Sequence, residues 1–199
     1  MSTAAPAASA GTVLADLLPA SSAARARLRD AALIAGGAGL TGLAAQLSVP
    51  VPGSPVPVTG QTFAALLVGT ALGARRGFAS LLLYAVAGVA GLPWFAGGSS
   101  GWSMPSFGYI LGMLAASAVV GALARRGGDR TVLRMAGVMV LGSAVIYAIG
   151  VPYLAHSAHL SASRAVALGL RPYLLGDAIK AALAMTALPA AWKLAGGRD

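Results

Sequence analysis

Long apolar stretches alternate with short polar connections along most of the 199-residue chain. A helix needs about 20 predominantly apolar residues to cross a bilayer, and most of these stretches approach that length. The pattern therefore predicts an all-α, polytopic membrane bundle of six transmembrane helices. The expected spans are residues 31–49, 59–72, 77–92, 105–124, 132–154 and 171–192.

The basic residues predict how these spans are oriented, because connections rich in Lys and Arg stay on the cytoplasmic side of a membrane. With the amino terminus in the cytoplasm, 11 of the 14 basic residues lie in cytoplasmic segments and two, Arg164 and Arg171, lie outside. We therefore expect both termini to be cytoplasmic, in a multi-pass protein of the cytoplasmic cell membrane. The 11 cytoplasmic positions are Arg25, Arg27, Arg29, Arg75, Arg76, Arg125, Arg126, Arg130, Arg134, Lys193 and Arg198.

The composition agrees with a membrane protein and excludes other classes. The chain is 57% hydrophobic and 10% charged, with a mean hydropathy of +0.79, which is far from the average of soluble domains. Its net charge of +9 does not indicate nucleic-acid binding, because the basic residues lie in short connections between spans. The absence of cysteine excludes disulfides and thiol chemistry.

The amino-terminal residues differ from the rest of the chain. Residues 1–22 are rich in Ala and Ser and lack a basic segment ahead of an apolar core, unlike a cleaved signal peptide. We expect a mobile cytoplasmic N-terminal tail over residues 1–30. The six-helix membrane domain is expected over residues 31–195.

Two charges inside the last span are the strongest functional signal. Asp177 and Lys180 are the only formal charges well inside any long apolar stretch. An ionisable side chain at the bilayer centre costs about 2.5 to 3.5 kcal/mol on insertion scales, so such residues usually pair or line a polar cavity. Three positions apart on a helix, they project from one face. We expect a ligand site near the outer end of the span, although an internal ion pair is the alternative.

A charge-free loop of glycines and aromatics follows the third span. Gly97 and Gly98 permit a backbone path close to a ligand, which favours a lid. Trp94 and Trp102 equally fit an interfacial turn, because tryptophan is enriched at membrane interfaces. The loop is not a phosphate-binding loop, since no Gly-Lys-Ser/Thr follows it.

Small residues form a stripe along the first span. Ala31, Ala35 and Gly39 recur every four residues, a spacing that lets another helix approach closely in lipid. The stripe predicts a surface for a partner helix, and packing within the bundle itself is the alternative.

The sequence lacks the motifs of the common catalytic centres, and no enzyme activity, metal or cofactor is expected. No nucleotide-binding, zinc-protease or serine-hydrolase motif is present. His156 and His159 have a spacing that can hold a metal on a helix, but no third ligand lies nearby, so solvated interfacial histidines are favoured. If a solute moves uphill, a partner supplies the energy. A self-sufficient secondary transporter and a membrane assembly subunit without a ligand remain alternatives.

Four sequence blocks stand out: residues 56–62 (Val-Pro-Val-Thr-Gly-Gln-Thr), 91–98 (Gly-Leu-Pro-Trp-Phe-Ala-Gly-Gly), 105–109 (Pro-Ser-Phe-Gly-Tyr) and 176–181 (Gly-Asp-Ala-Ile-Lys-Ala). Within a likeness that covers residues 31–194, these blocks resemble the BioY family. BioY proteins are biotin-binding S components of energy-coupling factor (ECF) transporters, six-helix membrane proteins that work with a transmembrane coupling subunit and two ATPases. The resemblance therefore implies high-affinity biotin binding and uptake with those partners in the lipid bilayer.

The resemblance also assigns roles to individual residues. Asp177 and Lys180 match the family's polar pair, Tyr109 a pocket aromatic, and Gly97 with Gly98 the lid. Asp177 can accept from the ureido N–H groups of biotin while Lys180 donates to the ureido carbonyl, and the aromatic rings of Trp94 and Tyr109 can cover the thioether ring.

The orientation of biotin is left open by the sequence. In the competing orientation its carboxylate binds Lys180, whereas in the preferred one it lies nearer the mouth, with Arg171 as a candidate partner. One departure from the family pattern, Ser106-Phe107 in place of Thr-Gly, lies beside the pocket aromatic Tyr109.

Overall fold

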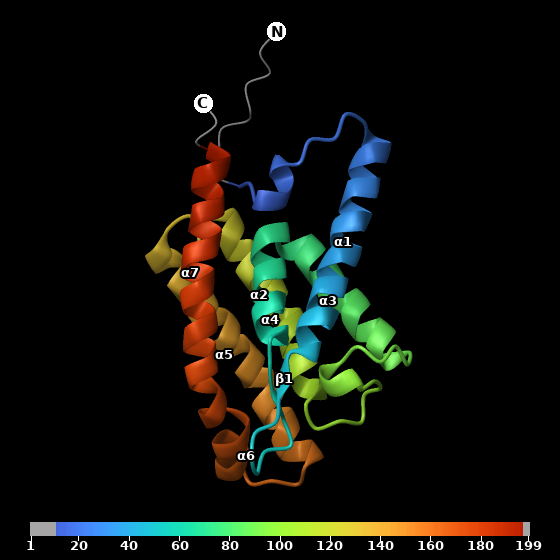
Figure 1. The fold of residues 1–199 in the computed structure, drawn as a ribbon, viewed down its shortest axis with the longest axis vertical. Helices are drawn as coiled ribbons and strands as arrows, with labels where there is room; N and C mark the ends of the chain where they lie inside the picture. Colours follow the sequence, from blue (N-terminus) through green and yellow to red (C-terminus); the bar gives the residue numbers. More distant parts are fainter. Residues whose placement is uncertain (1–10, 197–199) are drawn as a thin grey trace.

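Six long helices form the bundle in the computed structural model, which describes residues 11–196 (Figure 1). The all-helical, six-helix prediction is confirmed. A two-residue antiparallel strand pair, β1 (Ser48–Val49) with β2 (Val58–Thr59), closes the proline-rich connection after the first helix. The long helices are α1 (Ala23–Gln46), α2 (Gln61–Leu72), α3 (Ala74–Val89), α4 (Phe107–Arg125), α5 (Val132–Ser157) and α7 (Leu174–Gly196).

The first helix begins eight residues before the predicted span. Ser22 has an extended backbone, and its side-chain oxygen accepts from the Arg25 N–H at 3.2 Å, so it caps the amino terminus of α1. A hydropathy pattern marks the apolar part of a helix, whereas the cap sets its start. The boundary expected at residue 30 therefore differs from the structure.

Residues 11–18 also pack onto the bundle, which shortens the predicted tail further. Val13 is fully buried beside the short 3₁₀ helix η1 (Leu14–Leu17). The Arg76 guanidinium donates to Asp16 at 2.7 Å and lies 3.1 Å from Asp30. Burial alone would raise the pKa of Asp16, but the hydrogen bonds from Arg76 and the Val13 N–H outweigh it and hold that pKa below its usual value. Residues 1–10 lie outside the described part, so their mobility stays a prediction.

Glycines let α4 sit at the centre of the bundle, close to both α2 and α5. A Cβ on Gly112 would lie 2.7 Å from the carbonyl oxygen of Ile146 on α5, and one on Gly69 of α2 would lie 2.6 Å from the carbonyl oxygen of Ser117 on α4. Only glycine permits such close backbone approach. The side chains at the outer ends of these helices consequently face a common space.

The chain covers the end of the bundle opposite the termini with three connections (Figure 1). The predicted link between the fifth and sixth spans contains a short helix, α6 (Ala162–Gly169), and the first residues of the predicted sixth span form the 3₁₀ helix η3 (Arg171–Tyr173). Ser54 of the proline-rich connection donates to the Leu168 carbonyl at 2.9 Å and lies 2.9 Å from the Tyr173 hydroxyl. Tyr173 in turn donates to the Val56 carbonyl. These bonds hold the proline-rich connection against α6 and η3.

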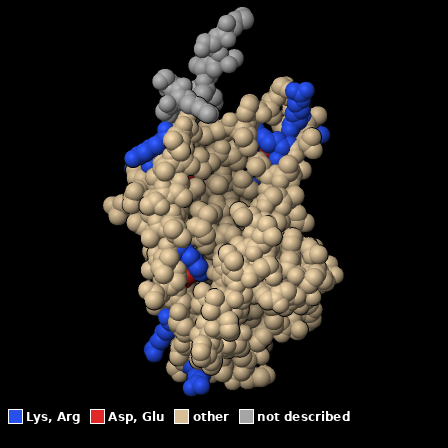
Figure 2. Space-filling model, viewed as in Figure 1, with Lys and Arg blue, Asp and Glu red and all other residues tan. Residues whose placement is uncertain are grey.

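The outer surface of the bundle is apolar, as expected of a surface in contact with lipid. Large apolar side chains such as Leu43 on α1 and Val140 on α5 are 72% and 68% exposed. Figure 2 shows Lys and Arg gathered at the two ends of the molecule, with a largely uncharged belt between them that a blue and red patch interrupts. Within residues 11–196, three segments are long and apolar enough to cross a membrane by length and composition, namely Phe107–Arg125, Val132–Ser157 and Ala162–Ala195.

The two ends of the described chain lie at the same end of the bundle (Figure 1). This placement is required if both termini are to be on one side of the membrane. That this side is the cytoplasm stays a prediction, which depends on the distribution of Arg and Lys.

Candidate functional site: a polar pair in a cavity

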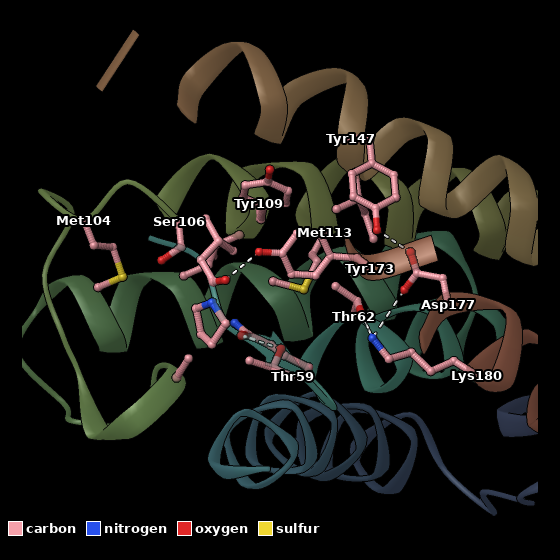
Figure 3. Close-up of a pocket in the computed structure, with 16 residues that line it drawn as sticks. Thr59, Thr62, Met104, Ser106, Tyr109, Met113, Tyr147, Tyr173, Asp177 and Lys180 are labelled. Carbon is pink, nitrogen blue, oxygen red and sulfur yellow. Dashed lines mark hydrogen bonds and ion pairs between the residues drawn. The ribbon is translucent and has the colours of Figure 1, made fainter. Parts of the chain in front are cut away.

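A cavity lies between α2, α4, α5 and α7 under the connections that cover the outer end of the bundle. Its empty space is ≈ 570 Å³ when the open mouth is counted. Most of the lining is apolar or aromatic, and its two charged side chains lie at one end (Figure 3). The lining residues are Val56, Pro57, Thr59, Gln61, Thr62, Ala96, Met104, Ser106, Tyr109, Ile110, Met113, Ile146, Tyr147, Tyr173, Asp177 and Lys180.

Asp177 and Lys180 both line this cavity, and their side chains meet at its polar end (Figure 3). The Lys180 ammonium lies 3.3 Å from the Asp177 Oδ1 atom. The two side chains are only 16% and 17% exposed. The helical spacing i, i+3 places both on one face of α7, as the sequence predicts, and the apolar surroundings strengthen every charge-assisted bond that they make.

Two hydroxyl groups from other helices complete the polar cluster. Thr62 on α2 accepts from the Lys180 ammonium at 2.8 Å, and Tyr147 on α5 donates to Asp177 Oδ2. The cluster therefore ties α7 to α2 and to α5. Sequence reasoning missed both residues. Thr62 closes the first of the four family-like blocks, and Tyr147 places a phenol in a long apolar stretch, so each had a signal in the sequence.

Tyr109, predicted as a pocket aromatic, forms part of the cavity wall. Its hydroxyl donates to the Gly169 carbonyl at 2.7 Å, which anchors α4 to the end of α6. Its ring meets the ring of Tyr147 edge to face, with centroids 6.3 Å apart and an interplanar angle of 87°. Gly150 makes room for this ring, because a Cβ there would lie 2.6 Å from it.

Trp94, Gly97 and Gly98 do not line the cavity. The Trp94 ring packs on Gly42 of α1, and its indole N–H donates to the Tyr84 carbonyl at 3.0 Å. Gly97 and Gly98 have φ angles of 66° and 70° and are exposed in the tight turn η2 (Ala96–Gly98). Of this block only Ala96 reaches the cavity. Trp94 therefore anchors the loop to α1 and α3, and a lid role for the glycines stays a prediction.

The small-residue stripe of α1 is open over much of its length. Ala31 and Ala35 are exposed and Gly39 is half-buried. An apolar groove runs beside it between α1, α2 and α7, lined by residues such as Gly36, Leu67 and Leu188. The role of Ala31, Ala35 and Gly39 as a partner surface stays a prediction.

Of the remaining candidates, only Ser106 lines the cavity. The Phe107 ring lies 6.5 Å from that of Phe95 and 6.2 Å from that of Tyr153, and it does not line the cavity. Ser106, the other departure from the family pattern, does line it. Arg171 is exposed and outside the lining. Helix α5 ends at Ser157, so His156 and His159 do not share a helical turn.

Comparisons with known proteins find one family that resembles this chain along most of its length. A sequence model described as the BioY family matches residues 18–197. The chain is 35% identical over 162 residues to a "Probable biotin transporter BioY" of Pyrococcus horikoshii, covering 80% of this chain and 93% of the relative. It is 34% identical over 160 residues to "Biotin transporter BioY2" of Lactococcus lactis, covering 79% and 86%.

A solved structure shares the fold. It is the crystal structure of the S-component for biotin from an ECF-type ABC transporter, with a TM-score of 0.76 at 20% identity, over 88% of this chain and 94% of that one. At this identity the likeness concerns the fold of a membrane S-component.

Proposed function

Because the chain belongs to the BioY family, we propose that it binds biotin in the cavity at Asp177 and Lys180 and serves as the substrate-binding component of an ECF-type uptake transporter. The observation that carries the proposal is the juxtaposition, in one largely apolar cavity, of a carboxylate acceptor and an ammonium donor 3.3 Å apart. It is a transporter component rather than an enzyme.

The polar end of the cavity complements the ureido ring of biotin. That ring has two N–H donors and one carbonyl acceptor on one compact, planar group. Asp177 accepts from the N–H side, and Lys180 donates to the carbonyl. Both bonds are charge-assisted, which makes each about twice as strong as a neutral hydrogen bond.

The rest of the cavity suits the apolar parts of the molecule. Tyr109, Ile110 and Met113 offer aromatic and aliphatic surface to the thioether ring, and the sulfur of Met113 adapts to an irregular shape. With the ureido ring at the pair, the aliphatic chain runs toward Met104 and Ser106, which lie at the other end of the view in Figure 3. The carboxylate then lies near the mouth, where water solvates it. The reverse orientation places the carboxylate at Lys180.

Energy for uphill transport comes, in this proposal, from partner proteins. The sequence has no nucleotide-binding motif, and the pair is not part of a longer chain of titratable groups. A transmembrane coupling subunit with ATP-binding-cassette ATPases fills this role. We assign its contact to Ala31, Ala35 and Gly39 with the neighbouring groove, because small residues permit close helix approach in lipid.

Calorimetric titration of the purified protein with biotin tests the proposal. We expect tight 1:1 binding by the wild type and at least about tenfold weaker binding by Asp177→Asn and by Lys180→Met, since loss of one charge-assisted bond costs about 1.5–3 kcal/mol. Lys193→Met is the matched control, because Lys193 is exposed near the other end of the same helix. A wild type without biotin-dependent heat, or two site variants with unchanged affinity, would overturn the proposal.

A further inference from the structure

We infer that Tyr147 is a positioning residue of this site, which holds the Asp177 carboxylate so that its Oδ1 atom faces the cavity and accepts from a ligand N–H. The inference rests on the proposed function and adds the residue that orients the Asp177 carboxylate toward the ligand. Tyr147 acts through Asp177 rather than by its own contact with the ligand.

The hydrogen-bonding capacity of the pair fits a urea once Tyr147 is counted. A carboxylate has about four acceptor positions and a lysine ammonium has three donors. Among the contacts of the described residues, Tyr147 takes one position on Asp177 Oδ2 and Lys180 one on Oδ1. A second N–H group of Lys180 donates to Thr62. About two acceptor positions and one donor remain, enough to accept from a ureido N–H group and to donate to the ureido carbonyl.

The position of Asp177 between two spaces explains why it needs an anchor. Asp177 lines the central cavity and also a second, mostly apolar groove between α5 and α7. Small residues such as Ser143, Ala144 and Ala178 border that groove, so they leave the carboxylate room to turn away from the ligand. The bond from Tyr147 crosses from α5 to α7 (Figure 3), and Tyr147 lines both spaces as Asp177 does. It therefore fixes the rotamer in which Oδ1 points to Lys180.

Tyr147 is itself held in place, which a positioning role requires. Its ring stands edge to face on Tyr109, whose hydroxyl is bound to the Gly169 carbonyl. This chain of contacts joins α6, α4, α5 and α7. Removing the Tyr147 hydroxyl alone leaves the ring stack intact, so Tyr147→Phe isolates the bond to Asp177.

A double-mutant cycle on biotin affinity tests the inference. We expect Tyr147→Phe to weaken biotin binding about tenfold in the wild-type background, the effect of one lost charge-assisted bond, and by less than about twofold in an Asp177→Asn background. A general structural role would give the same factor in both backgrounds. Tyr153→Phe is the matched control, because Tyr153 lies on the same helix and donates to the Trp102 carbonyl away from the cavity.

Ligand selectivity supplies a second readout that a structural defect would not change. The readout is the dissociation constant of a biotin analogue methylated on a ureido nitrogen, divided by the dissociation constant of biotin. We expect this ratio to be at least about fivefold lower in Tyr147→Phe than in the wild type, because the Asp177 carboxylate is less firmly oriented. Tyr147→Met provides the same comparison if the phenylalanine variant does not fold.

The outcomes separate this inference from the function on which it rests. A wild type that does not bind biotin overturns the proposed function and the inference together. A wild type that binds, with Tyr147→Phe equal to it in affinity and selectivity or with additive effects in the cycle, overturns the inference alone.

Discussion

Trp192, near the carboxyl end of α7, donates its indole N–H to the buried carboxylate of Asp129 at 2.7 Å. Asp129 belongs to the connection between α4 and α5, so this bond ties the carboxyl end of α7 to that connection. Arg130 adds a cation–π contact, with its guanidinium carbon 3.4 Å from the centroid of the Trp192 ring. Helix α7 is thus held by polar ties near both ends, and Asp177 and Lys180 form the outer one.

We predict that Trp192→Phe destabilises the protein by about 1–3 kcal/mol, because the buried Asp129 carboxylate loses a hydrogen-bond donor while the aromatic surface remains. Thermal unfolding in detergent measures the effect. Trp102→Phe is the control, since Trp102 is 67% exposed. Equal melting temperatures for the wild type and Trp192→Phe would show that the bond contributes nothing.

The pH dependence of the Trp192→Phe effect has a definite sign. Burial raises the pKa of Asp129 above 3.8, although the Trp192 hydrogen bond and the Arg130 charge oppose the rise. A raised pKa means that the folded state holds a proton that the unfolded state has released, so this carboxyl destabilises the fold as pH rises from about 3.8 through the raised pKa. Removing the donor raises the pKa further. The stability gap between wild type and Trp192→Phe should therefore narrow as pH falls from the higher Asp129 pKa of the variant to the Asp129 pKa of the wild type, and a constant gap would contradict the assignment.

Thr62→Val tests the second anchor of the site. Thr62 accepts from the Lys180 ammonium at 2.8 Å. Without the Thr62 hydroxyl the ammonium can move toward Asp177, so it is less well placed to donate to a ligand carbonyl. We expect biotin affinity to fall about three- to tenfold, since loss of a bond that only positions the ammonium passes on part of the about 1.5–3 kcal/mol of a hydrogen bond to a charged group. Titration calorimetry measures it. Thr62→Ser, which keeps the hydroxyl, should bind like the wild type, and a serine variant as weak as valine would point to lost packing instead.

Much of the fold could be predicted from the pattern of apolar residues. Five of the six long helices begin within about three residues of the predicted spans, because apolar stretches of this length and their flanking Arg and Pro residues are strong local signals. The exception, α1, begins earlier because Ser22 caps it among charged residues. Helix α6 is only eight residues long, too short for a span pattern to indicate.

The site could be predicted only in part, because some of its residues are unusual in an apolar span and others are not. Asp177 and Lys180 are charges among apolar residues and are conspicuous in the sequence. Thr62 and Tyr147 carry hydroxyls, which spans tolerate in many roles, and they lie 118 and 30 positions from Lys180 and Asp177 respectively. Their proximity arises from helix packing, which sequence spacing does not reveal. Trp94 was expected in the pocket as an aromatic residue but faces α1 and α3.

The orientation of biotin is tested with its methyl ester, which keeps the ureido ring and removes the carboxylate charge. With the ureido ring at the pair and the carboxylate near solvent at the mouth, the ester should bind the wild type within about tenfold of biotin, and Lys180→Met should weaken both ligands by a similar factor. In the reverse orientation Lys180→Met would weaken biotin far more than the ester. Competition against labelled biotin measures both constants, and Lys193→Met again serves as the control.

Ala35→Leu separates ligand binding from coupling to a partner. Ala35 is exposed on α1, outside the cavity, so a larger side chain there leaves the site intact but blocks close approach of another helix. We expect unchanged biotin affinity together with at least about tenfold slower uptake in cells that contain the coupling subunit and ATPases, because the lost helix contact costs more than about 1.4 kcal/mol. Ala148→Leu is the matched control, since Ala148 is exposed on α5, away from this surface. Uptake by Ala35→Leu at the rate of Ala148→Leu would assign the partner surface to another face of the bundle.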